Sequence, residues 1–199
     1  MKKTIITAML IVQSTLLLSK PVADADTTAS AHSTYEVQKT FEAESLFPMF
    51  LTNGYHFCAA YRFNHFRVRI SVINGGTYDA EPAGVSNAQG DFKRYYKPSP
   101  GVFFGYNVWK NLEVYTFLEG HTFQIEQKTT GMKQDMKSLD FGGGVSYQFF
   151  IGRVFYIQPG AHIYLRERKT LQFAGALYRI PGVDLAPVIR IGFRLWEKE

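Results

Sequence analysis

Ser138-Leu-Asp-Phe-Gly-Gly-Gly-Val-Ser-Tyr-Gln-Phe149 and Arg153-Val-Phe-Tyr-Ile-Gln-Pro-Gly-Ala-His-Ile-Tyr-Leu-Arg166 are two runs of alternating residues, separated only by Phe150-Ile151-Gly152. One face of each run is apolar, and the other mixes charge, amide, hydroxyl and glycine. Period-two alternation on both sides of a tight connection predicts a β-hairpin. The apolar faces hold Leu139, Phe141, Val145, Tyr147 and Phe149, and Phe155, Ile157, Ala161, Ile163 and Leu165.

The same alternation recurs along most of the remaining chain. Thr34–Leu46 also fits a helical spacing through Val37, Phe41 and Ser45, so its own pattern leaves strand and helix open. The other predicted strands alternate more clearly. They are Leu51–Phe63, Phe66–Val72, Val102–Val108, Leu112–His121 and Leu185–Trp196.

Short and long connections alternate between these strands. We predict turns at Asn64-His65, at Trp109–Asn111, which sets Val108 opposite Leu112, and at Phe150–Gly152. We predict loops over residues 74–97, 128–137 and 167–182. Outer-membrane barrels place short turns in the periplasm and long loops outside. This parity requires a strand before Leu51–Phe63, and counting Thr34–Leu46 gives eight strands, an even number with both ends in the periplasm.

The N-terminus has the order of a secretory signal peptide. Lys2 and Lys3 precede the apolar run Thr4–Ser19, and the small residues Ala23-Asp-Ala25 fit a cleavage site. We therefore predict a signal peptide over residues 1–25, a short polar leader over 26–33 and a barrel domain over 34–199. No later apolar run is long enough for a transmembrane helix.

Charge and cysteine content exclude some classes of protein. The formal net charge is +5, and loss of three lysines and one aspartate with the signal peptide leaves +3. So small an excess does not indicate a nucleic-acid partner. Cys58 is the only cysteine, so no internal disulfide can form. A small exported domain without disulfides needs a large core or a bilayer for stability.

Two further patterns favour a bilayer. A closed barrel satisfies every backbone polar group in lipid, and aromatic residues gather at its interfaces. The aromatic residues near the predicted short turns, which would form such an interface, are Tyr61, Phe63, Phe66, Trp109, Tyr147, Phe149, Phe150, Phe155 and Trp196. The face opposite the apolar one holds Arg62, Arg67, Arg69, Arg190 and Arg194 with Glu36, Glu42, Glu44, Glu113, Glu119 and Asp140. We predict a packed lumen of ion pairs and tyrosines without an open channel.

Two of these positions make the lumen prediction specific. A turn at Asn64-His65 sets Arg62 directly opposite Arg67, which repels unless a carboxylate compensates. Glu36 lies near the same end, and closure of the barrel places its strand beside Arg194.

On these residues, the chain resembles the small eight-stranded outer-membrane barrels of bacteria, the porin-like group that includes the outer-membrane protein A and X barrels. The resemblance covers Thr34–Trp196 and is one of pattern, without a diagnostic motif. It implies an all-β, eight-stranded antiparallel up-and-down transmembrane β-barrel in the bacterial outer membrane. Many such chains end on an aromatic residue, whereas here Phe193-Arg-Leu-Trp196 is followed by Glu197-Lys-Glu199.

No residue set in the sequence carries a strong catalytic, cofactor or metal signature. The predicted hairpin register sets Asp140 opposite His162, which is a lumenal ion pair more often than a catalytic dyad. His56 and Cys58 share a face but lack further ligands for a metal. Gly142-Gly-Gly144 is not followed by a helix pattern, so relief of lumen crowding or barrel curvature is favoured over phosphate binding. The pair Arg67 and Arg69 is likewise read as lumen filling.

We therefore expect an integral outer-membrane protein without enzymatic activity, which maintains the envelope or contacts a surface or envelope partner through its outer loops. Three alternatives remain open on the sequence: a small pore, a lipid-modifying barrel enzyme that uses Asp140 and His162, and a soluble periplasmic carrier like a lipocalin. The carrier requires the apolar face to point inward.

Overall fold

A computed structural model describes residues 38–80 and 90–198. Within these ranges the chain is all-β apart from one four-residue helix. No helix in the described ranges is long and apolar enough to cross a membrane. The predicted signal peptide with its cleavage near Ala25, the leader over 26–33 and the start of the first strand, with Glu36, lie outside the described residues.

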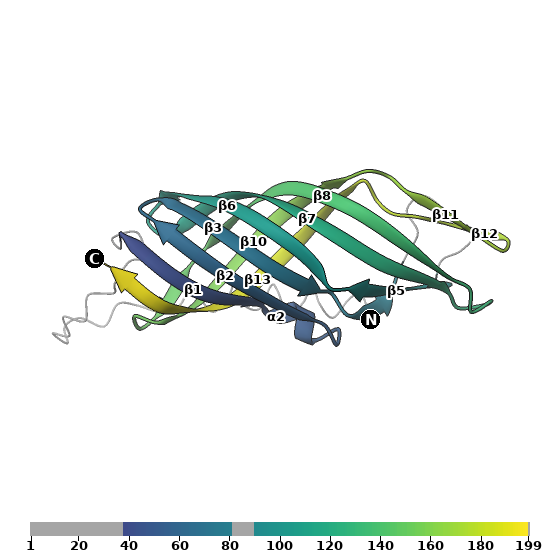
Figure 1. The fold of residues 1–199 in the computed structure, drawn as a ribbon, viewed down its shortest axis with the longest axis horizontal. Helices are drawn as coiled ribbons and strands as arrows, with labels where there is room; N and C mark the ends of the chain where they lie inside the picture. Colours follow the sequence, from purple (N-terminus) through teal and green to yellow (C-terminus); the bar gives the residue numbers. More distant parts are fainter. Residues whose placement is uncertain (1–37, 81–89, 199) are drawn as a thin grey trace, which may run out of the picture. The chain divides into compact units, whose positions relative to one another are not determined.

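The elements follow one another in the order shown in Figure 1. They are β1 (Lys39–Leu46), α2 (Phe47–Phe50), β2 (Tyr55–Phe63), β3 (Phe66–Asn74), β4 (Thr77–Asp79), β5 (Phe92–Lys97), β6 (Ser99–Trp109), β7 (Leu112–Gln127), β8 (Lys133–Tyr147), β9 (Phe149–Ile151), β10 (Phe155–Arg166), β11 (Thr170–Phe173), β12 (Ala176–Arg179) and β13 (Val183–Lys198).

Eight of the described strands close into an antiparallel barrel, which confirms the predicted fold class. β1 pairs with β2 on one side and with β13 on the other, and β7 pairs with both β6 and β8. The ring is β1-β2-β3-β6-β7-β8-β10-β13. The sequence pattern of Thr34–Leu46 did not decide between a strand and a helix, and the described part of this segment forms strand β1. Because the ring is closed, none of its eight strands is an edge strand with a row of unpaired backbone groups.

Both chain ends of the barrel and the tight turns lie at one end, which we call the short-turn end. Asn64-His65 forms the predicted turn with Asn64 at a φ of 52°, and Arg62 stands opposite Arg67 as expected. The next turn is Lys110-Asn111 rather than Trp109–Asn111, because Lys110 takes the positive φ of 46°. An irregularity beside Trp109 absorbs the difference, so Asn107 and Glu113 pair as the predicted register requires.

The prediction for the third turn was wrong in position. Gly152 supplies the positive φ of 71° at the start of the turn, and Ile151 pairs with Phe155. The pairing of the two strands is therefore displaced by four residues from the prediction. An even displacement keeps every side chain on its predicted face while changing its partner. Asp140 consequently pairs with Arg166, and His162 stands opposite Gly144.

At the opposite end, which we call the long-loop end, strands replace much of the predicted loops. β7 and β8 stay paired out to Glu126 and Lys133, and β5 pairs with the outer part of β7. β11 and β12 form a separate hairpin beyond β10 (Figure 1). We call β4, β5, β11, β12 and residues 122–137 the outer lobe. Conversely, Leu51 is not in a strand: α2 and a turn occupy residues 47–54, and β2 begins at Tyr55.

The outer lobe has an apolar core of its own, separate from the polar lumen. Its residues are Ala80, Phe92, Phe123, Ile125, Met136, Phe173, Tyr178 and Ile180. The buried guanidinium of Arg94 lies over the ring of Phe123 at 4.9 Å and donates to the hydroxyls of Tyr78 and Tyr178. These contacts join segments that are distant in sequence. A prediction based on local alternation of residues therefore assigned these segments to loops.

Side chains face as predicted along the barrel wall. The outward positions form an apolar belt that includes Ile70, Val72, Phe104, Leu118, Leu139, Phe141, Val145, Ile163, Leu185, Ile189 and Phe193. At the short-turn end, Tyr61, Phe63, Phe66, Trp109, Phe149 and Trp196 are exposed as the predicted aromatic girdle. Tyr147 and Phe155 are half-buried, and the ring of Phe150 lies against the lumenal side chains of Tyr156 and Arg194.

The glycine run of β8 leaves room for lumenal rings. A Cβ at Gly144 would meet the ring of Tyr115 at 2.6 Å and the carbonyl oxygen of Ala161 at 2.7 Å. This agrees with the predicted relief of crowding. We therefore expect Gly144→Ala to lower the free energy of unfolding by about 1–3 kcal/mol through overpacking. Urea titration of the folded barrel measures this.

Gly120→Ala is the matched control, since a Cβ at Gly120 meets nothing within 4 Å. Equal effects of the two substitutions would show that general strand properties, and not the Tyr115 contact, govern the cost.

Candidate functional site

The lumen near the short-turn end is filled by a network centred on one arginine. Arg67 of β3 crosses the lumen and is ion-paired with Glu42 and Glu44 of β1 and, at 3.1 Å, with Glu113 of β7. It also donates to Tyr156 and Gln158 of β10. A single side chain thus joins walls on several sides of the barrel.

Neighbouring arginines complete this network. Arg62, which faces Arg67 across the β2–β3 pair, donates to Gln148 at 2.7 Å, and Arg69 is paired with Glu113. Arg190 lies over the rings of Phe103 and Tyr115. Because charged groups out of water must find partners, the short-turn half of the lumen is the predicted assembly of ion pairs and tyrosines.

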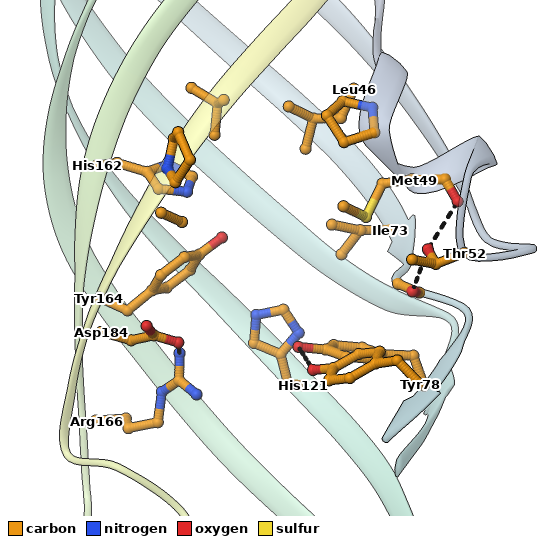
Figure 2. Close-up of a pocket in the computed structure, with 16 residues that line it drawn as sticks. Leu46, Met49, Thr52, Ile73, Tyr78, His121, His162, Tyr164, Arg166 and Asp184 are labelled. Carbon is orange, nitrogen blue, oxygen red and sulfur yellow. Dashed lines mark hydrogen bonds and ion pairs between the residues drawn. The ribbon is translucent and has the colours of Figure 1, made fainter. Parts of the chain in front are cut away.

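Above this network, towards the long-loop end, the lumen opens into a cavity of about 360 Å³. Figure 2 shows its two unlike walls, with His162, Tyr164 and Arg166 on one side and Leu46, Met49 and Ile73 on the other. The remaining lining residues are Pro48, Thr52, Gly75, Tyr78, Tyr96, His121, Asp184, Ala186, Pro187 and Val188. A cavity with an apolar wall and a few converging polar groups is the usual form of a small-molecule site.

The polar wall is held by carboxylates behind it. His121 Nε2 lies 3.4 Å from a carboxylate oxygen of Glu119 and 3.6 Å from one of Asp140. Arg166 Nε lies 3.0 Å from the same Asp140 oxygen, and its Nη2 lies 3.9 Å from Asp184. The charges of this wall are therefore paired with one another.

The tyrosines of the outer lobe add neutral hydroxyls to the cavity. Tyr78 and Tyr96 approach each other at 3.5 Å between their oxygens. Burial, and then the neighbouring Tyr78, raises the pKa of Tyr96 above its ordinary value, so this hydroxyl stays protonated.

The apolar wall includes the helix α2, which continues the barrel wall where β1 ends. Beyond Leu46, β13 and β2 have no strand between them, and α2 packs against both. The backbone N–H of Leu46 donates to Nδ1 of His56 at 3.1 Å, so a side chain takes the place of a missing strand partner. Met49 points into the cavity, while Phe47 and Phe50 are exposed outside.

The structure separates one of the residue pairs that the sequence placed together and keeps the others on the lumenal face. Asp140 and His162 do not form the predicted pair, because the hairpin register differs and Asp140 pairs with Arg166 and His121. His56 and Cys58 both face inward, but His56 Nδ1 is occupied by Leu46, and the described residues contain no group of three or more potential metal ligands. Arg67 and Arg69 are carboxylate-paired, as the lumen-filling interpretation requires.

Sequence reasoning missed the cluster around His121. Glu119 and His121 were placed on the lumenal face, but the strand was ended at His121, so their neighbours from β10 and β13 were not recognised. Continued alternation through Phe123 and Ile125 was the available signal.

This cluster does not have the arrangement of an acyl-transfer site. Ser138, opposite His121 across the β7–β8 pair, donates its hydroxyl to Asp140. The Ser138 hydroxyl is therefore not hydrogen-bonded to His121, as the serine of a Ser-His-Asp triad is to its histidine.

Comparisons with known proteins add little to this description. No protein-family model and no curated protein matches the chain. Among solved structures, the crystal structure of Neisserial surface protein A (NspA) is similar, with 14% sequence identity, a TM-score of 0.38, and coverage of 79% of this chain and 94% of that chain.

The Arg67 network predicts an unequal cost for two ion-pair substitutions. Arg67→Met leaves buried carboxylates without their shared partner, and we expect a loss of about 3–5 kcal/mol in the free energy of unfolding. Lys97→Met removes a pair whose side chains are 44% and 51% exposed. We expect the loss there to be at most about 1 kcal/mol. Urea unfolding of both variants in lipid vesicles measures the difference, and equal losses would contradict the central position of Arg67.

Proposed function

We propose that this protein is an integral barrel of the bacterial outer membrane, with the lipid bilayer as its main partner. The observation that carries the proposal is the distribution of side chains: the exposed wall is apolar, whereas the enclosed lumen is charged. A protein folded in water has the reverse distribution. The exposed belt also disfavours the soluble-carrier alternative, in which the apolar face would be inside.

The ends of the barrel support one orientation in the membrane. Short turns, an aromatic girdle and both strand termini at one end are typical of the periplasmic side. The outer lobe then lies at the cell surface. Export by a signal peptide cleaved near Ala25 is part of the same proposal.

We further propose a non-enzymatic role in which the outer lobe supports the envelope or contacts a surface partner. A lobe with its own apolar core holds its shape without a partner, and paired strands fix the position of its outward side chains. The Arg67 network supports a closed lumen rather than a pore.

Two arginine substitutions on adjacent residues of β8 test the membrane assignment. Val145 faces outward and Ser146 faces the lumen. Val145→Arg should cost about 2–4 kcal/mol if its site lies near the bilayer centre, because a lipid-facing charge is poorly solvated. Ser146→Arg should act through crowding of the lumen, without a dependence on lipid.

The readout is unfolding in vesicles, together with gel mobility before and after boiling. A folded barrel should migrate differently until heated. Insertion of Val145→Arg with undiminished stability, or recovery of the processed chain from buffer without detergent, would refute the assignment.

Conductance separates the proposed role from a pore. In planar bilayers the protein should show no steady ion current, since Arg67 and its partners occupy the lumen. Reproducible single-channel steps from the unmodified protein would instead establish the pore alternative.

A further inference from the structure

Among the residues that line the cavity, one buried polar side-chain atom has neither a hydrogen bond nor an ion pair with the described residues. This atom is Nδ1 of His121, a residue that is 4% exposed and lines the cavity. Figure 2 shows the ring between the two walls. Buried polar atoms are rarely left unpaired in native proteins, so such an atom facing a cavity indicates a partner that the chain does not supply.

The surroundings of His121 define what that partner must offer. Nε2 faces the carboxylates of Glu119 and Asp140, so in a neutral ring the proton is on Nε2. Nδ1 then carries a lone pair and accepts a hydrogen bond. A partner at Nδ1 of the neutral ring must therefore donate a hydrogen bond, as a hydroxyl does.

The charges of the polar wall argue for an uncharged partner. Arg166 is paired with Asp140 and approaches Asp184, and the remaining polar groups at the surface of the cavity are hydroxyls and imidazoles. A carboxylate here would neither donate to Nδ1 nor find an unpaired cation among the lining residues.

The opposite wall suits a hydrocarbon chain. It is formed by Leu46, Met49, Ile73 and Val188, which pack against one another. Opposed apolar and hydrogen-bonding walls within about 360 Å³ fit a small amphiphile better than a sugar or a peptide.

The helix α2 offers a route from the bilayer. On its outer side Phe47 is 46% exposed, Phe50 47% and Leu51 75%, and the neighbouring outward residues Val183 and Leu185 of β13 are 63% and 67% exposed. The wall at this point is one helical turn, without the continuous hydrogen-bonded strands found elsewhere. A short segment with few backbone bonds opens at a lower free energy than a paired strand.

We propose that the cavity binds an uncharged single-chain amphiphile whose head donates a hydrogen bond to His121, and that this amphiphile arrives from the outer leaflet past α2. The inference rests on the proposed membrane location. It assigns the cavity a ligand class, a long-chain alcohol or an acylglycerol, in addition to the surface role.

The test uses the mature chain in lipid nanodiscs and the ¹⁵N NMR signals of the His121 ring. The probes are 1-decanol, decyl methyl ether and decanoate at equal mole fraction in the bilayer. Decanol should shift the Nδ1 signal with saturation. The ether has no hydrogen-bond donor and decanoate is charged. Both should therefore bind with an affinity at least about tenfold lower than that of decanol. Equal binding of the ether, or no response to decanol, would overturn the proposal.

Two substitutions on β3 provide the matched control. Ile73 lines the cavity, whereas Ile70 on the same strand faces outward and is 63% exposed. Ile73→Trp should abolish the decanol shift by filling the cavity, and Ile70→Trp should leave it intact. Loss of the shift in both variants, or in neither, would place binding outside the cavity.

The route past α2 has its own measurement. Pro48 lies in the first turn of α2, where its ring restricts the backbone. Pro48→Gly should increase the exchange rate of decanol several-fold, and an unchanged rate would exclude this route. Gel mobility of the same nanodisc samples separates the two failures: a heat-modifiable barrel without a decanol response overturns this inference alone, whereas a chain that never inserts overturns the proposed function.

Discussion

A backbone N–H or C=O that faces hydrocarbon has no water to bond, so each segment of the wall must find its partners within the protein. The ring meets this requirement by pairing β1 with β2 and β13 and by pairing β7 with β6 and β8. The same requirement explains the exception. Where β1 stops, the imidazole of His56 accepts from Leu46, and α2 makes its own internal bonds.

Closure determines what the lumen can contain. In a ring of this size the inward side chains meet across the barrel axis, so charges placed there must be paired. Arg67 is paired with carboxylates from different parts of the wall, Glu42 of β1 and Glu113 of β7. Arg62 instead donates a hydrogen bond to the amide oxygen of Gln148. Towards the long-loop end the lumen opens into the cavity, where the wall charges are again paired. The lumen therefore has a half that is filled by ion pairs and a half that contains the cavity.

The facing of side chains was predictable from sequence, because it depends only on alternation. The expected faces are confirmed for Val145, Ser146 and Ile189. The turn at Asn64 was recognised because the polar residues Asn64 and His65 separate two clearly alternating strands. The hairpin partners were not predictable, since Gly152 and not Phe150 begins the turn and moves Asp140 away from His162. The outer lobe was missed for a different reason.

In the lobe, Phe92 and Arg94 alternate within a charged segment that resembles a loop, and their partners Phe173 and Tyr178 come from a distant hairpin. Likewise, no local pattern indicates that Asp140 contacts both His121 and Arg166. Such contacts depend on tertiary register.

The seam between β1 and β13 joins the first and last described strands of the chain. Contacts between such distant segments raise the contact order, and the entropy of closing so long a loop must be offset before the ring gains its final row of bonds. Until the last strand is synthesised and delivered, both seam strands have unpaired edges that another chain can join. The closed topology thus makes assembly a late, all-or-none event that requires an intact C-terminal strand.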